Sequence, residues 1–79
     1  MRTVLFVDDE KPILKAIERI YHDRSDIRIL VAPSAQDGLE ILKQEEVWVV
    51  VSDYMMPGMK GIDFLSRVNL LYPQTVRVM

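Results

Sequence analysis

The sequence contains no cysteine and no hydrophobic run long enough to cross a bilayer. Without cysteine, neither a disulfide nor a thiolate–metal centre can stabilise the fold. The apolar stretch after Thr3 soon ends in Asp8, Asp9 and Glu10, so it is too short and too acidic for a signal peptide. No basic block of the kind that binds nucleic acid is present. We therefore expect no membrane and no nucleic-acid partner for this segment, and a cytoplasmic location.

The size and composition predict one small domain. The 79 residues are 49% hydrophobic and 28% charged, which is ordinary for a globular protein and leaves no room for two separate cores. A chain of this length buries only roughly 60–65% of the surface that it exposes when unfolded. We therefore expect marginal stability.

The most informative stretch of the sequence runs from Trp48 to Gly61. It begins with an apolar run, residues 48–51, that is typical of a strand buried on both faces of a parallel sheet, and we expect Trp48 in the core. Asp53 follows the strand, and Pro57 and Gly58 then turn the chain. Asp53 is thus placed at the carboxyl end of a central strand, where open α/β sheets bind ligands. The alternative is that Asp53 only begins the turn.

Strands alternate with helices along the whole chain. The expected strands cover about residues 3–7, 27–32, 47–52 and 76–79, and the expected helices cover about residues 11–23, 35–44 and 62–71. Such alternation predicts an α/β fold with a parallel sheet and right-handed crossovers. If the chain reverses its winding after the second strand, the strand order is 2-1-3-4, and a crevice opens between strands one and three.

This strand order would bring Asp8 and Asp9 beside Asp53. Two carboxylates about 4 Å apart repel each other by on the order of 4 kcal/mol at an effective dielectric near 20. Such a cluster favours a hard divalent cation, and Mg²⁺ fits best because it combines a few carboxylates with water and phosphate oxygens. A carboxylate beside the metal could then act as a nucleophile toward a phosphoryl group. The alternative is that residues 8–10 only supply acidic residues to a helix start.

Two motifs resemble the receiver domain of bacterial two-component response regulators. They are Val7-Asp8-Asp9-Glu10, and Asp53-Tyr54-Met55-Met56-Pro57-Gly58-Met59-Lys60-Gly61. The resemblance covers the whole chain and implies a flavodoxin-like, doubly wound parallel sheet. It implies that Asp53 accepts a phosphoryl group from a sensor histidine kinase. It further implies that Asp9 binds Mg²⁺ directly, that Asp8 does so largely through water, and that the main-chain carbonyl of Met55 is another ligand.

The chain departs from the family pattern at its C-terminal side. The family places a Ser or Thr after strand four and a Lys after strand five, and the sequence stops at Met79, before either position. We therefore interpret residues 1–79 as the N-terminal part of a receiver domain, without the fifth strand and the last two helices. A longer natural protein, with an output domain, is expected, and phosphorylation of the fragment is expected to be weak.

Three hypotheses for the function follow. The first is a phosphoacceptor signalling domain that is not an enzyme beyond its own phosphorylation and dephosphorylation. The second is an interaction or dimerisation module that keeps the fold without being phosphorylated. The third, a phosphatase-like hydrolase, is disfavoured because that chemistry usually needs a second Asp where this chain has Met55. The strand-four edge, with apolar Val76, Val78 and Met79, also predicts a homo-oligomer. The expected form is a two-fold dimer that uses this edge or exchanges elements between chains.

Overall fold

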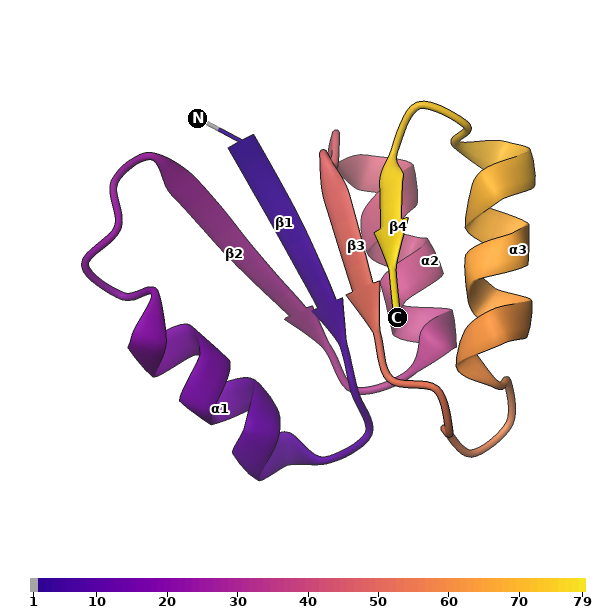
Figure 1. Cartoon of the computed structure of the whole chain (residues 1–79), viewed down its shortest axis with the longest axis horizontal. Helices are drawn as coiled ribbons and strands as arrows, with labels where there is room; N and C mark the ends of the chain where they lie inside the picture. The colour runs from indigo at the N-terminus through magenta and orange to yellow at the C-terminus, as the bar shows by residue number, and fades with distance from the viewer. Residues whose placement is uncertain (1) are drawn as a thin grey trace.

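The computed structural model describes residues 2–79 and alternates strands with helices (Figure 1). The elements are β1 (Arg2–Val7), α1 (Lys11–Ile20), β2 (Ile27–Ala32), α2 (Ala35–Gln44), β3 (Val49–Ser52), α3 (Gly61–Leu71) and β4 (Val76–Val78). The order and type of every predicted element are confirmed. The largest difference is at α1, which ends at Ile20 rather than near Asp23.

All four strands form one parallel sheet in the order β2-β1-β3-β4. The predicted fold class, a flavodoxin-like doubly wound sheet with the order 2-1-3-4, is therefore confirmed. The winding reverses between β1 and β3, whose last residues, Val7 and Ser52, are paired. The carboxyl ends of these two strands thus lie side by side, which is where such sheets place their ligands.

The hydrophobic core lies between the sheet and the helices α2 and α3. Figure 1 shows α2 behind the sheet and α3 beside β4. Leu5 and Val50, from the two central strands, and Phe64 and Val68, from α3, are fully buried. The four-residue spacing on α3 places its two residues on one face of the helix, because α-helices repeat every 3.6 residues. The same helix begins next to the carboxyl end of β3, so core packing also holds the functional end of the sheet.

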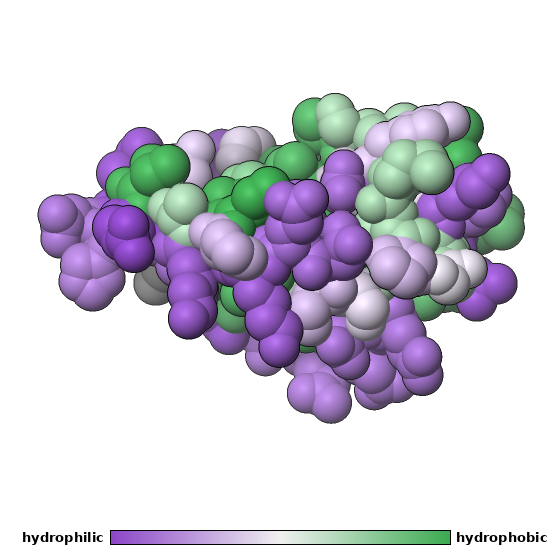
Figure 2. Space-filling model, turned by 90° about the horizontal axis from the view of Figure 1, so that it is seen from below, coloured by the Kyte–Doolittle hydropathy of each residue, from purple (hydrophilic) through white to green (hydrophobic). Residues whose placement is uncertain are grey.

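The opposite face of the sheet is less well covered. Of the apolar residues on α1, Leu14 is buried, whereas Ile13 and Ile20 are 41% and 71% exposed. Val76 and Val78 in β4 are also exposed. Figure 2 shows hydrophobic residues along the side of the sheet that faces away from α2. The apolar residues of α1 are therefore only partly used for packing within this chain.

The prediction that Trp48 lies in the core is wrong. Trp48 is 44% exposed, because it precedes β3 and sits at the amino end of the sheet rather than inside it. Its backbone N–H still donates to the carbonyl of Thr3 over 2.8 Å. The guanidinium of Arg2 lies 4.2 Å from the centre of the indole ring, and this cation–π contact covers one face of the ring instead of core side chains.

The first turn of α2 is capped by Ser34. The Ser34 hydroxyl accepts a hydrogen bond of 3.1 Å from the backbone N–H of Asp37, which satisfies one of the unpaired donors at the helix start. Within residues 2–79, no helix combines the length and the apolar character that a bilayer span requires.

Candidate functional site

The backbone of the sheet places two acidic loops next to each other. Asp8 and Asp9 directly follow β1, and Asp53 directly follows β3. The N–H of Asp53 donates to the carbonyl of Val7 over 2.9 Å, and the N–H of Asp8 donates to the carbonyl of Ala32 over 3.1 Å. The ladder hydrogen bonds therefore continue one residue beyond the strands and fix the main chain of both loops.

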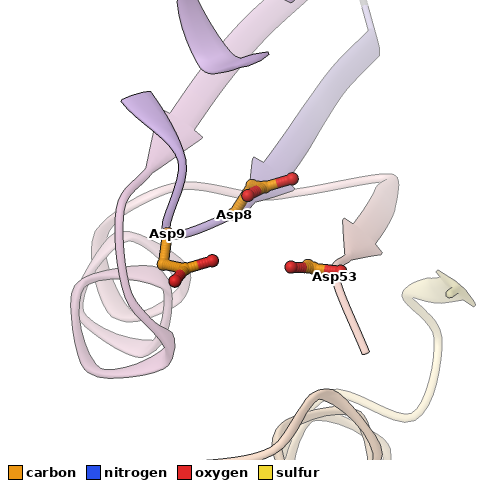
Figure 3. A group of neighbouring side chains, drawn as sticks. All are labelled: Asp8, Asp9 and Asp53. Atoms are coloured by element: carbon orange, nitrogen blue, oxygen red, sulfur yellow. The ribbon is translucent and has the colours of Figure 1, made fainter. Parts of the chain in front are cut away.

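The structure brings all three predicted carboxylates together. Asp8, Asp9 and Asp53 each offer one carboxylate oxygen, and these oxygens lie within 4.8 Å of one another. Figure 3 shows the side chain of Asp53 extending toward those of Asp8 and Asp9 from the other loop. Asp8 and Asp53 are half-buried and Asp9 is exposed, so a ligand can reach the cluster from solvent.

The cluster has the donor chemistry of a site for a hard divalent cation. Carboxylates at this separation or closer repel each other by roughly 3.5 kcal/mol or more per pair at an effective dielectric near 20, and by less where water screens Asp9. One oxygen of Asp8 is less available to a metal, because Oδ1 accepts a hydrogen bond of 2.9 Å from the backbone N–H of Glu10. Oxygen ligands and concentrated negative charge are what Mg²⁺ selects, so the residues present fit this ion.

The loop that follows Asp53 is anchored by Met56. Met56 is buried in the core cluster, whereas its neighbours Tyr54 and Met55 are 52% and 60% exposed. Met55 lies two residues beyond Asp53, in the loop between β3 and α3. The assignment of its main-chain carbonyl as a metal ligand stays a prediction.

Two residues at the site were missed by the sequence analysis. Ser52, predicted only to end a strand, is buried and its hydroxyl donates to the carbonyl of Asp53 over 3.0 Å. Gly61, the first residue of α3, donates its N–H to the carbonyl of Tyr54 over 2.7 Å. The available signals were the hydroxyl next to the acidic residue and the glycine at a helix start, but neither indicates a contact across the loop.

The family of the chain follows from a match along nearly its whole length. Residues 4–79 match the family model described as the response regulator receiver domain. The chain belongs to this family. The predicted resemblance is therefore confirmed, and the acidic cluster lies in a receiver domain.

Similar proteins include regulators that are much longer than this chain. The hydrogenase transcriptional regulatory protein HoxA of Cupriavidus necator is 36% identical over 76 residues, which cover 96% of this chain and 15% of HoxA. The transcriptional regulatory protein YvrH of Bacillus subtilis is 38% identical over 67 residues, covering 85% of this chain and 28% of YvrH.

The fold is shared with solved receiver domains. The signal receiver domain of an HD domain-containing protein from Pseudomonas fluorescens Pf-5 matches with a TM-score of 0.91 and 29% identity, over 96% of this chain and 60% of that one. The chain thus spans 60% of this receiver domain and less than a third of either regulator. Over residues 2–79, the arrangement of the strands and helices is that of a receiver domain.

Proposed function

We propose that this receiver domain is a phosphoacceptor of two-component signalling, which takes a phosphoryl group from a sensor histidine kinase onto Asp53. The observation that supports the proposal best is the convergence of the Asp8, Asp9 and Asp53 carboxylates within 4.8 Å at the switch point of the sheet. Of the three, Asp53 alone follows β3, between a fixed strand end and the start of α3, and the family resemblance assigns it the acceptor role.

The roles of the acidic residues differ. Asp9 and Asp53 would hold Mg²⁺ directly, Asp8 would hold it largely through water, and the Met55 carbonyl would complete the protein ligands. When bound, Mg²⁺ neutralises charge on the transferring oxygens and helps to align the donor. A carboxylate oxygen of Asp53 forms a bond to phosphorus while the bond between phosphorus and the histidine nitrogen of the kinase breaks. The product is an aspartyl phosphate on Asp53 and a free histidine on the kinase.

The proposed partners follow from this role. They are a sensor histidine kinase, which this protein meets in the cytoplasm, and, in a longer protein, an output domain, as the transcriptional regulators among the relatives suggest. Residues 1–79 act in this proposal as the N-terminal part of the receiver domain. The domain catalyses no reaction beyond its own phosphorylation and dephosphorylation.

A second candidate function is an interaction module that is never phosphorylated. The observation that favours it is the exposed apolar edge strand β4, where Val76 and Val78 are 48% and 45% exposed. A homo-oligomer through this edge is compatible with both functions, so oligomerisation alone does not distinguish them. Phosphorylation by a small phosphodonor distinguishes the two functions, because only the phosphoacceptor should form an adduct.

The test is to incubate the protein with Mg²⁺ and acetyl phosphate and to look for one added phosphoryl group by mass spectrometry. We expect a slow, Mg²⁺-dependent adduct that is absent from Asp53→Asn. The matched control is Asp63→Asn, which removes a carboxylate from the exposed first turn of α3 and should leave the adduct unchanged. No adduct on folded protein, or an adduct that persists in Asp53→Asn, would favour the interaction module.

A further inference from the structure

We propose that Ser52 and Gly61 are positioning residues, which hold the peptide group between Asp53 and Tyr54 and thereby aim the Asp53 carboxylate at Asp8 and Asp9. The inference rests on the proposed function of Asp53 as phosphoacceptor. According to this inference, the two contacts orient one side chain, in addition to any contribution that they make to the stability of the fold.

Ser52 holds this peptide group from the side of the sheet. The residue is 2% exposed, and its hydroxyl donates to the carbonyl oxygen of Asp53 over 3.0 Å. A buried hydroxyl needs a partner, and among residues 2–79 no buried side-chain nitrogen or oxygen lacks one. The bond therefore ties the orientation of the carbonyl of Asp53 to a side chain that cannot move freely.

Gly61 holds the same peptide group from the side of α3. A Cβ atom at this position would stand less than 3.0 Å from the carbonyl oxygen and the carbonyl carbon of Asp53 and from the Cα of Tyr54, closer than real Cβ atoms come to other heavy atoms. The N–H of Gly61 also donates to the carbonyl of Tyr54 over 2.7 Å. Only glycine lets the first turn of α3 lie against the backbone of the acceptor residue.

A hydrogen bond in the sheet and the two contacts together restrain the backbone of Asp53. The N–H of Asp53 is already bonded to the carbonyl of Val7. With Ser52 bonded to its carbonyl and Gly61 packed against the same peptide group, the backbone of Asp53 is fixed on both sides of its Cα. The direction of the Cα–Cβ bond that carries the carboxylate is therefore set by the backbone, before any metal or donor arrives.

The chain provides matched pairs of variants for a test. Ser52→Ala removes the hydroxyl and Ser52→Thr keeps it. Gly61→Ala places a Cβ against the Asp53 carbonyl, whereas Gly58→Ala strains a turn residue with a φ of +86° that has no heavy atom within 4 Å of the added Cβ. Loss of stability can occur in either glycine variant, so stability alone does not test the proposal.

The readouts are the NMR signal of the Asp53 carboxyl carbon in metal-free protein, the affinity for Mn²⁺, and the initial rate of phosphorylation by acetyl phosphate. We expect Ser52→Ala and Gly61→Ala to shift the carboxyl signal, to weaken Mn²⁺ binding, and to slow phosphorylation by about tenfold or more, because misplacements of about 1 Å in reacting groups can cost a hundredfold. Ser52→Thr should restore all three readouts. Gly58→Ala should leave the carboxyl signal unchanged even where its melting temperature falls.

The result that would overturn the proposal is a wild-type carboxyl signal and Mn²⁺ affinity in folded Ser52→Ala and Gly61→Ala. An equal shift in Gly58→Ala would also overturn it, because the loop as a whole would then control the carboxylate. If Gly61→Ala does not fold, the Ser52 pair decides. If the wild-type protein takes no phosphoryl group, the proposed function fails, while the carboxyl signal and Mn²⁺ binding still decide the positioning.

Discussion

The backbone N–H of Asp53 donates a hydrogen bond of 2.9 Å to the carbonyl oxygen of Val7. Val7 immediately precedes Asp8, so this single bond between the ends of β3 and β1 places the proposed acceptor beside the acidic pair. The cluster is therefore a consequence of parallel pairing between two strands that are not consecutive in the chain. Because the proposed metal ligands come from both strand ends, metal binding and the pairing of these ends should stabilise each other.

We expect Asp9→Asn to weaken Mg²⁺ binding more than Asp8→Asn. One oxygen of Asp8 already accepts a hydrogen bond from the N–H of Glu10, and an Asn side chain keeps an acceptor oxygen for that bond. Asp9 has the more exposed carboxylate and is the proposed direct ligand. Isothermal titration calorimetry with Mg²⁺, or with Mn²⁺ if the heats are small, measures the difference. Equal affinity in wild type and Asp9→Asn would contradict the assignment.

We expect Phe64→Ala to reduce the free energy of unfolding by about 3–5 kcal/mol, because it empties a fully buried aromatic site. In a domain of this size, that loss is a large part of the total stability, so much of the protein should be unfolded at 25 °C. Leu70→Ala is the matched control on the same helix, since Leu70 is 82% exposed, and it should change stability by less than about 0.5 kcal/mol. Urea denaturation followed by circular dichroism measures both, and similar losses in the two variants would contradict the core assignment.

The turn between α1 and β2 contains an ion pair with a testable pH dependence. The Arg24 guanidinium donates two hydrogen bonds, of 2.9 and 2.8 Å, to the carboxylate of Asp26. These bonds lower the pKa of Asp26 below its usual value. A lowered pKa stabilises the folded state above the unfolded pKa, and this contribution is lost as the pH falls through the folded pKa.

We therefore expect Arg24→Gln to raise the pKa of Asp26 toward its usual value, as measured by NMR titration of the carboxyl carbon. Any difference in stability between wild type and Arg24→Gln should be present at neutral pH and disappear as the pH falls below about 4. Both side chains are exposed, so the effect on stability should be small. Arg19→Gln removes the same charge from α1 and serves as the control. A pKa of Asp26 that is unchanged in Arg24→Gln would show that the ion pair does not form in solution.

We expect the 79-residue chain to associate through β4. Among residues 2–79 this strand pairs with β3 alone, so one of its edges is open there, and Val76 and Val78 are about half exposed. Open edges with apolar side chains pair readily with other chains, and a charged residue on the edge prevents such pairing. Light scattering should therefore detect a dimer for the wild type and a monomer for Val78→Lys.

Leu70→Lys is the control for this experiment, because it adds the same charge to an exposed position on α3. It should leave the dimer intact if association uses the β4 edge. A wild-type monomer that melts sharply at high protein concentration would show that the edge needs no partner.

The local pattern of residues determined the elements and the acidic motifs of this protein. Apolar runs such as residues 49–51 specify strands, Ser34 marks the start of α2, and Tyr72-Pro73 marks the end of α3, because each signal acts through backbone geometry within a few residues. The expected strand order 2-1-3-4 predicted the convergence of the carboxylates, and the resemblance of the Asp8-Asp9 and Asp53 motifs to receiver domains predicted the family.

Contacts between distant residues were decided only by the tertiary structure. Trp48 belongs to an apolar run, yet it is exposed because the strand begins one residue later and the ring lies at the end of the sheet. The contacts of Ser52 and Gly61 with the backbone of Asp53 depend on how the loop returns from the sheet to α3. A sequence pattern reports which face of an element is apolar, but the distance between two loop atoms is set by the packing of whole elements against the core.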